Sequence, residues 1–116
     1  SALLYGSVLA YIALTGTGQV TVQEPLSFVG SSSFEVSLYP QQSVSAQLTV
    51  ANASPVAMDV DLISSVTPDP GTKGLTIGIP NKITVPGNGQ TIVTITITAG
   101  KSAEPGVYTV SIAFDR

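Results

Sequence analysis

The chain has 116 residues, 43% of them hydrophobic and only 9% charged, with a formal net charge of −3. This length suits one domain with its own core. The charged fraction is far below the usual value of about a quarter, which indicates that much of the surface is covered in use. The four cations are scattered along the chain, which argues against binding to nucleic acid. They are Lys73, Lys82, Lys101 and Arg116.

The chain contains neither histidine nor cysteine. It therefore lacks the usual general base, the thiol nucleophile and the commonest zinc ligands, and it forms no disulfide. Asp59, Asp61 and Asp69 supply too few oxygen ligands for calcium and do not have EF-hand spacing. The alternation around Asp59 and Asp61 instead predicts a solvated strand face. We expect no enzyme activity, no cofactor and no metal site.

The most hydrophobic stretch comprises residues 2–14 (ALLYGSVLAYIAL), which carry no charge and precede Gly16 and Gly18. The run is too short to cross a bilayer, which takes about 20 apolar residues, and no basic residue precedes it as in a signal peptide. We therefore expect no stable membrane span. Two fates remain open: the segment folds back on its own domain as a strand or helix, or it packs into a neighbouring molecule.

As a strand, residues 2–14 would present large apolar side chains on both faces, unlike an edge strand exposed to water. An extended segment from Ser1 to Gln19 reaches about 60 Å, farther than one domain of this size is wide. We expect it to act as a donor strand that enters another copy, with Gly16 and Gly18 as the hinge. The predicted interface residues are Leu3, Tyr5, Leu9 and Tyr11 on one face and Leu4, Val8, Ile12 and Leu14 on the other. Residues 1–18 thus form the donor segment and hinge, and residues 19–116 form the domain.

The remainder of the chain alternates apolar and polar residues between short turns. The predicted strands lie at 20–28 (a strand pair or one bent strand), 34–38, 44–50, 56–62, 75–79, 83–85, 91–98 and 107–114. The clearest is TIVTITIT at 91–98, which is β-branched throughout and should place Val93, Ile95 and Ile97 on one face. A turn is predicted before it at residues 86–89 (PGNG). The last strand is expected to turn Tyr108, Val110, Ile112 and Phe114 inward. Short strands spaced about 8–12 residues apart predict an all-β fold, an antiparallel β-sandwich of immunoglobulin-like or jelly-roll type.

Three stretches, LYPQQSVSAQLTVANAS, ITVPGNGQTIVTITIT and EPGVYTVSIAF, resemble the immunoglobulin-like modules common on microbial surface proteins. These modules share an LYPGQ-like turn, an ITVPGNG-like hairpin and a PGxYTVxI-like last strand. The hydrophobic run that leads into TGTGQVTVQEPLSF also resembles archaeal pili and threads related to TasA and camelysin-like biofilm fibre proteins. The second resemblance implies donor-strand complementation, in which the N-terminal segment of one subunit completes the sandwich of the next.

Asn52-Ala53-Ser54 is a candidate N-glycosylation site at a predicted strand end, with Asn52 as the acceptor. Pro55 directly after the triplet weakens this prediction.

The expected function is that of a structural subunit of an extracellular, cell-surface filament that serves adhesion or biofilm cohesion. Its main partner is then another copy of itself, with other cells or filaments as further partners. Two alternatives remain: a type IV pilin-like subunit with a short N-terminal helix, and an immunoglobulin-like binding module of a surface protein. A binding module needs an exposed aromatic platform or polar pocket. The chain has no tryptophan, and its four tyrosines are assigned to burial or turns.

Overall fold

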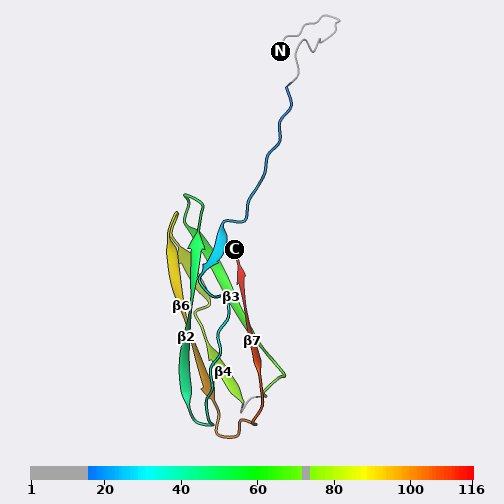
Figure 1. Cartoon of the computed structure of the whole chain (residues 1–116), viewed down its shortest axis with the longest axis vertical. Helices are drawn as coiled ribbons and strands as arrows, with labels where there is room; N and C mark the ends of the chain where they lie inside the picture. The colour runs from blue at the N-terminus through cyan, green and yellow to red at the C-terminus, as the bar shows by residue number, and fades with distance from the viewer. Residues whose placement is uncertain (1–15, 72–73) are drawn as a thin grey trace, which may run out of the picture.

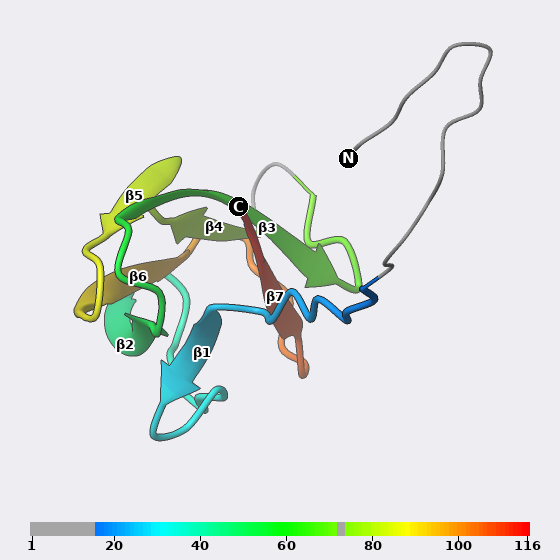
Figure 2. The same ribbon diagram turned by 90° about the horizontal axis from the view of Figure 1, so that it is seen from above.

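The computed structural model describes residues 16–71 and 74–116, which form two antiparallel sheets (Figures 1 and 2). One sheet has four strands in the order β1-β2-β6-β4, and the other has three in the order β5-β3-β7. The predicted antiparallel β-sandwich is therefore confirmed. The strands are β1 (Leu26–Val29), β2 (Ser43–Asn52), β3 (Met58–Thr67), β4 (Leu75–Gly78), β5 (Lys82–Val85), β6 (Gln90–Ala99) and β7 (Thr109–Asp115).

Within the described residues, no helix has the length and apolar character needed to cross a membrane.

The core lies between the long strands β2, β3 and β6 and the short strand β5. On β6, Val93, Ile95 and Ile97 point inward and are at most 2% exposed, whereas Thr94 and Thr96 on the opposite face are exposed. This alternation confirms the predicted phase of the strand and follows from the two-residue period of the β-backbone. The buried apolar cluster consists of Leu48, Val50, Val60, Leu62, Val85, Val93, Ile95 and Ile97.

The register of β2 and β6 places these apolar side chains in rows. Leu48 lies opposite Val93 and Ala46 lies opposite Ile95, so each row continues across the sheet. Such cross-strand pairs are what stabilise a sheet face. The rows from β2 and β6 meet Val60 of β3 in the middle of the sandwich.

The turn between β5 and β6 requires a residue that tolerates positive φ at one position and a residue without a side chain at another. Asn88 adopts a positive φ of 54°, a conformation that asparagine tolerates better than most residues. Gly87 keeps an ordinary φ, but a Cβ added there would overlap the backbone carbonyl of Pro55. The predicted PGNG turn is confirmed, although only Asn88 uses the left-handed region.

Several predicted strand boundaries differ from the structure. Val20 and Val22 are 91% and 87% exposed and precede the first strand, which begins at Leu26. Val56 belongs to a turn, and β3 continues past the predicted end at 62 to Thr67. Tyr108 precedes β7, and its hydroxyl donates a hydrogen bond of 2.7 Å to the carbonyl of Glu104. The ends of a strand depend on where it pairs with a neighbouring strand, and the alternation of apolar and polar residues does not specify that pairing.

The two isoleucines of β6 test this account of the core. Ile95 is completely buried and Ile92, on the same strand, is 59% exposed. We expect Ile95→Ala to lower the free energy of unfolding by about 2–5 kcal/mol, because it removes apolar contacts and leaves a cavity. Ile92→Ala should change it by roughly 0.5 kcal/mol or less. Urea unfolding followed by circular dichroism measures both, and equal effects would contradict the assignment of the inner face.

Candidate functional site

One lateral side of the sandwich, between β1 and β7, is not closed by any of the described strands. In the part of the chain that the structure describes, β1 pairs only with β2, and β7 pairs only with β3. An immunoglobulin-like sandwich has strands A, B, E and D in one sheet and C, F and G in the other. Strands β1, β2, β6 and β4 match the first sheet in order, and β3 and β7 match C and F. Strand β5, which follows β4 in the chain and pairs with β3, has no counterpart in this scheme. The position of strand G, beside β7, is empty among the described strands.

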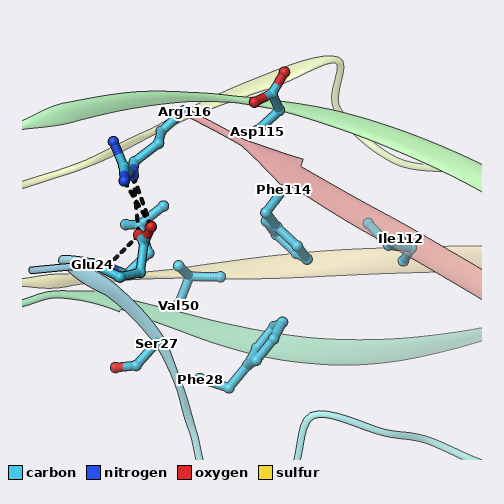
Figure 3. Close-up of a pocket in the computed structure, with 9 residues that line it drawn as sticks. Glu24, Ser27, Phe28, Val50, Ile112, Phe114, Asp115 and Arg116 are labelled. Carbon is cyan, nitrogen blue, oxygen red and sulfur yellow. Dashed lines mark hydrogen bonds and ion pairs between the residues drawn. The ribbon is translucent and has the colours of Figure 1, made fainter.

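A groove of about 610 Å³ lies on this side (Figure 3). The rings of Phe28 and Phe114 meet across it edge to face, with centroids 5.4 Å apart and an angle of 83° between the planes. This geometry is favourable for an aromatic pair. Apolar side chains from both sheets line the groove, namely Leu26, Phe28, Val50, Ile112 and Phe114. Its polar residues are Glu24, Ser27, Asp115 and Arg116.

Except for Val50, the apolar side chains along the groove are less covered than the rest of the core. Phe28 is 41% exposed, and the inward residues of β7, Val110, Ile112 and Phe114, are only half-buried. The corresponding inward residues of β6 are completely buried. Inner faces of a two-sheet sandwich normally cover each other fully. The open side therefore leaves apolar surface that another strand would cover.

Residues 34–38, predicted to form a strand, are extended but pair with none of the described strands. Phe34, Val36 and Leu38 are half-buried and pack against the core, and Glu35 and Ser37 are exposed, so the predicted alternation is correct. However, their backbone groups make no hydrogen bond to the backbone of any described residue. The segment runs down the sandwich between β2 and β7 (Figure 1). Its free backbone groups, like the outer edge of β7, are a template for an added strand.

An ion pair lies at the rim of the groove. The Nε of Arg116 donates to both carboxylate oxygens of Glu24, at 3.0 and 3.1 Å, and its Nη2 lies 2.8 Å from Oε1 (Figure 3). Glu24 Oε2 also accepts a hydrogen bond of 3.1 Å from the backbone N–H of Leu26. The pair joins the chain just before β1 to the residue just after β7, and so it links the two sheets.

These contacts change the proton affinity of both groups. The hydrogen bond from Arg116, followed by that from the Leu26 N–H, lowers the pKa of Glu24. The same hydrogen bond raises the pKa of Arg116. The Glu24 carboxylate is therefore ionised and paired with Arg116 at neutral pH. As the pH falls through its lowered pKa, the carboxylate is protonated and the ion pair is lost. Because both side chains are exposed to solvent, the pair adds little to overall stability.

The structure places few of the predicted site residues. The eight predicted interface residues, and with them the alternative of an N-terminal helix, lie outside the described residues. They are Leu3, Leu4, Tyr5, Val8, Leu9, Tyr11, Ile12 and Leu14. The hinge glycines Gly16 and Gly18 are exposed, with nothing within 4 Å of an added Cβ. The pairing of Glu24 with Arg116 was not predicted, because no local pattern connects two charges so far apart in sequence.

Two of the three aspartates with oxygen ligands for calcium, Asp59 and Asp61, lie on an outer strand face, whereas Asp69 follows β3 and accepts a hydrogen bond of 2.9 Å from the N–H of Gly71. Asp59 accepts a hydrogen bond of 2.7 Å from the hydroxyl of Thr84, and its other oxygen lies 4.0 Å from Lys82 Nζ. Asp61 is exposed, as the alternation predicts. Among the described residues, no group of three or more acidic side chains is placed to hold a metal ion.

Asn52, predicted as a glycan acceptor, is 2% exposed at the end of β2. Its Nδ2 donates to the carbonyls of Val56, at 2.7 Å, and Val85, at 3.2 Å. Its Oδ1 accepts from the N–H of Ser54 at 2.9 Å. Because Nδ2 is the atom that would carry the glycan, the folded domain does not offer this site for modification. The prediction does not fit the structure, and Asn52 instead ties β2 to the following turn and to β5.

No protein family, curated protein or solved structure significantly matches this chain.

Asn52 provides a test of its structural role. We expect Asn52→Asp to lower the free energy of unfolding by about 1–3 kcal/mol, because a carboxylate would face two carbonyl oxygens that have lost their donor. The exposed residue Asn81 offers a matched control, and Asn81→Asp should change stability by less than about 0.5 kcal/mol. Denaturant unfolding at neutral pH measures both variants. If they were equally stable, the network around Asn52 would contribute nothing.

Proposed function

We propose that this chain is a structural subunit of an extracellular filament, in which each copy donates its N-terminal segment to the groove of the next copy. The observation that supports this most directly is the vacant strand position beside β7. There, a strand edge and half-buried apolar side chains lie next to each other.

The composition of residues 2–14 suits such a groove. The groove is lined by Leu26, Phe28, Val50, Ile112 and Phe114, so it favours an apolar strand. The segment carries no charge, and it is apolar apart from Ser7 and the hydroxyl groups of Tyr5 and Tyr11. Its backbone would pair with the edge of β7, the mode by which an extended peptide adds a strand to a sheet. Its other edge would face the unpaired backbone of residues 34–38.

The course of the chain before β1 favours insertion into a second copy. Residues 16–23 are exposed and leave the sandwich in an extended conformation (Figure 1). Eight extended residues span about 26 Å, enough to carry the segment beyond its own domain. A contact between a tail and a groove elsewhere on an identical subunit is heterologous, and it generates an open filament unless the rotation closes.

The expected contact is strong enough to hold a filament together. Burying four or five large apolar side chains contributes about 1.5–3 kcal/mol each, or about 10 kcal/mol in total before the cost of ordering the segment. The partner is then mainly another copy of this chain. The extracellular location, and a role in adhesion to other cells or in biofilm cohesion, belong to this proposal. The small number of charged residues supports it, because a subunit surface that is covered by neighbours needs few charges.

Deleting residues 1–18 tests the donor role. We expect the shortened chain to remain monomeric, because the vacant position stays but nothing is left to fill it. A synthetic peptide of residues 1–18 should bind to this monomer and raise its melting temperature. Negative-stain microscopy and light scattering measure assembly, and fibres formed by the shortened chain would contradict the proposal.

A matched pair of substitutions on β7 tests the groove. Ile112 lines the groove, whereas its neighbour Ser111 is exposed on the opposite face. Ile112→Glu should prevent filament formation, because a buried unpaired carboxylate is costly, whereas Ser111→Glu should leave it unchanged. Circular dichroism must show that both variants fold, so that lost assembly reflects the groove itself.

A further inference from the structure

The chain is held tightly just where it leaves the domain. Pro25, whose ring restricts φ, accepts a hydrogen bond of 2.9 Å from the N–H of Ala53. On one side of it, the Glu24 carboxylate is bound by the Arg116 guanidinium, and on the other, the Leu26 N–H donates back to Glu24. Three successive residues are thus fixed by contacts to both sheets.

The chain before Glu24 is free in comparison. Residues 16–23 are all exposed, and none of them makes a hydrogen bond with another described residue. The change from held to free chain therefore falls at Glu24. The contact that marks this boundary also forms part of the groove rim (Figure 3).

We infer that the ion pair between Glu24 and Arg116 is a positioning clasp that directs the outgoing segment away from the groove of its own subunit. To enter its own groove directly, the chain would have to reverse at Glu24 and cross the position that the two side chains occupy. With the clasp intact, the nearest glycine, the residue type that most readily allows a tight reversal, is Gly18, about 20 Å farther out along an extended chain. A segment that turned back there would use much of its length in returning.

The clasp thus favours a second copy over self-insertion. The two competing states are insertion into a second copy and insertion into the groove of the same subunit. The clasp acts by making insertion into the same subunit less favourable. The inference rests on the proposed function for what the segment does, but the direction in which the segment leaves can be measured without any filament.

The direction can be read from a distance between two spin labels on the full chain. The chain has no cysteine, so Thr21→Cys and Ser102→Cys place labels only at those two exposed positions. Ser102 lies in the loop between β6 and β7, at the end of the sandwich opposite the outgoing segment (Figure 1). Pulsed electron paramagnetic resonance is recorded at a concentration at which light scattering shows monomers, with labelled chain diluted into unlabelled chain.

Wild type should give mainly long distances between the labels. Glu24→Ala and Arg116→Met should each increase the population of short distances by roughly two- to fivefold, the range expected for an exposed ion pair. The reversed pair Glu24→Arg with Arg116→Glu should restore most of the long distances, which the loss of a merely structural contact would not explain. Glu35→Ala, which removes an exposed carboxylate outside the groove, should have no effect.

Lowering the pH provides a second readout. Protonation of Glu24 should reproduce the effect of Glu24→Ala as the pH falls through its lowered pKa. The other charged groups at the rim are Arg116 and Asp115, and the groove residues of β1 and β2 are uncharged. Asp115→Asn should therefore leave unchanged the pH at which the population of short distances increases.

An unchanged distance distribution in Glu24→Ala and Arg116→Met would overturn the clasp. If the wild type and the variants show the expected distances but the chain forms no filaments at any concentration, the proposed function is refuted and the clasp is supported.

Discussion

The rest of the structure depends on an incomplete pairing at one side of a β-sandwich. Among the described residues, strand β7 is paired with β3 alone, and the extended residues 34–38 pack against the core without backbone partners. Hydrogen-bonding groups along a strand edge and apolar side chains beside it are both stabilised when a further strand arrives. The groove between β1 and β7 therefore offers two features to an added strand: the unpaired backbone groups of β7 and of residues 34–38, and an aromatic lining.

The two halves of the sandwich differ in how completely their inward side chains are buried. Around β6, the inward side chains are completely buried, and Asn52 secures the end of β2 to β5 through satisfied hydrogen bonds. This half holds the domain together. Toward β7, the same alternation leaves Ile112 and Phe114 only half-covered. A domain built in this way keeps a folded body while it retains apolar surface for binding, and the proposed donor strand would use that surface.

Charge is sparse in this chain, so the position of each ion pair matters. Asp59 and Lys82 lie on the outer face of the β5-β3-β7 sheet, where an exposed pair contributes little. Glu24 and Arg116 lie instead where the chain enters the sandwich and where the groove begins. This pair is also exposed, but it acquires a geometric role there, because it fixes the direction of a chain that is otherwise free. The proposed clasp depends on this position rather than on a large interaction energy.

The sequence by itself determined the all-β class, the inward faces of β2, β6 and β7, and the turn at residues 86–89. These features follow from local rules: a two-residue period, β-branched side chains and residues that tolerate positive φ. The period also identified the inward face of residues 34–38, but it could not show that their backbone is unpaired. Only the tertiary structure decided that β7 is an edge, that Asn52 is buried, and that Glu24 meets Arg116. Each of these depends on which distant segments come together, and the spacing of side chains along one strand does not specify the neighbour of that strand.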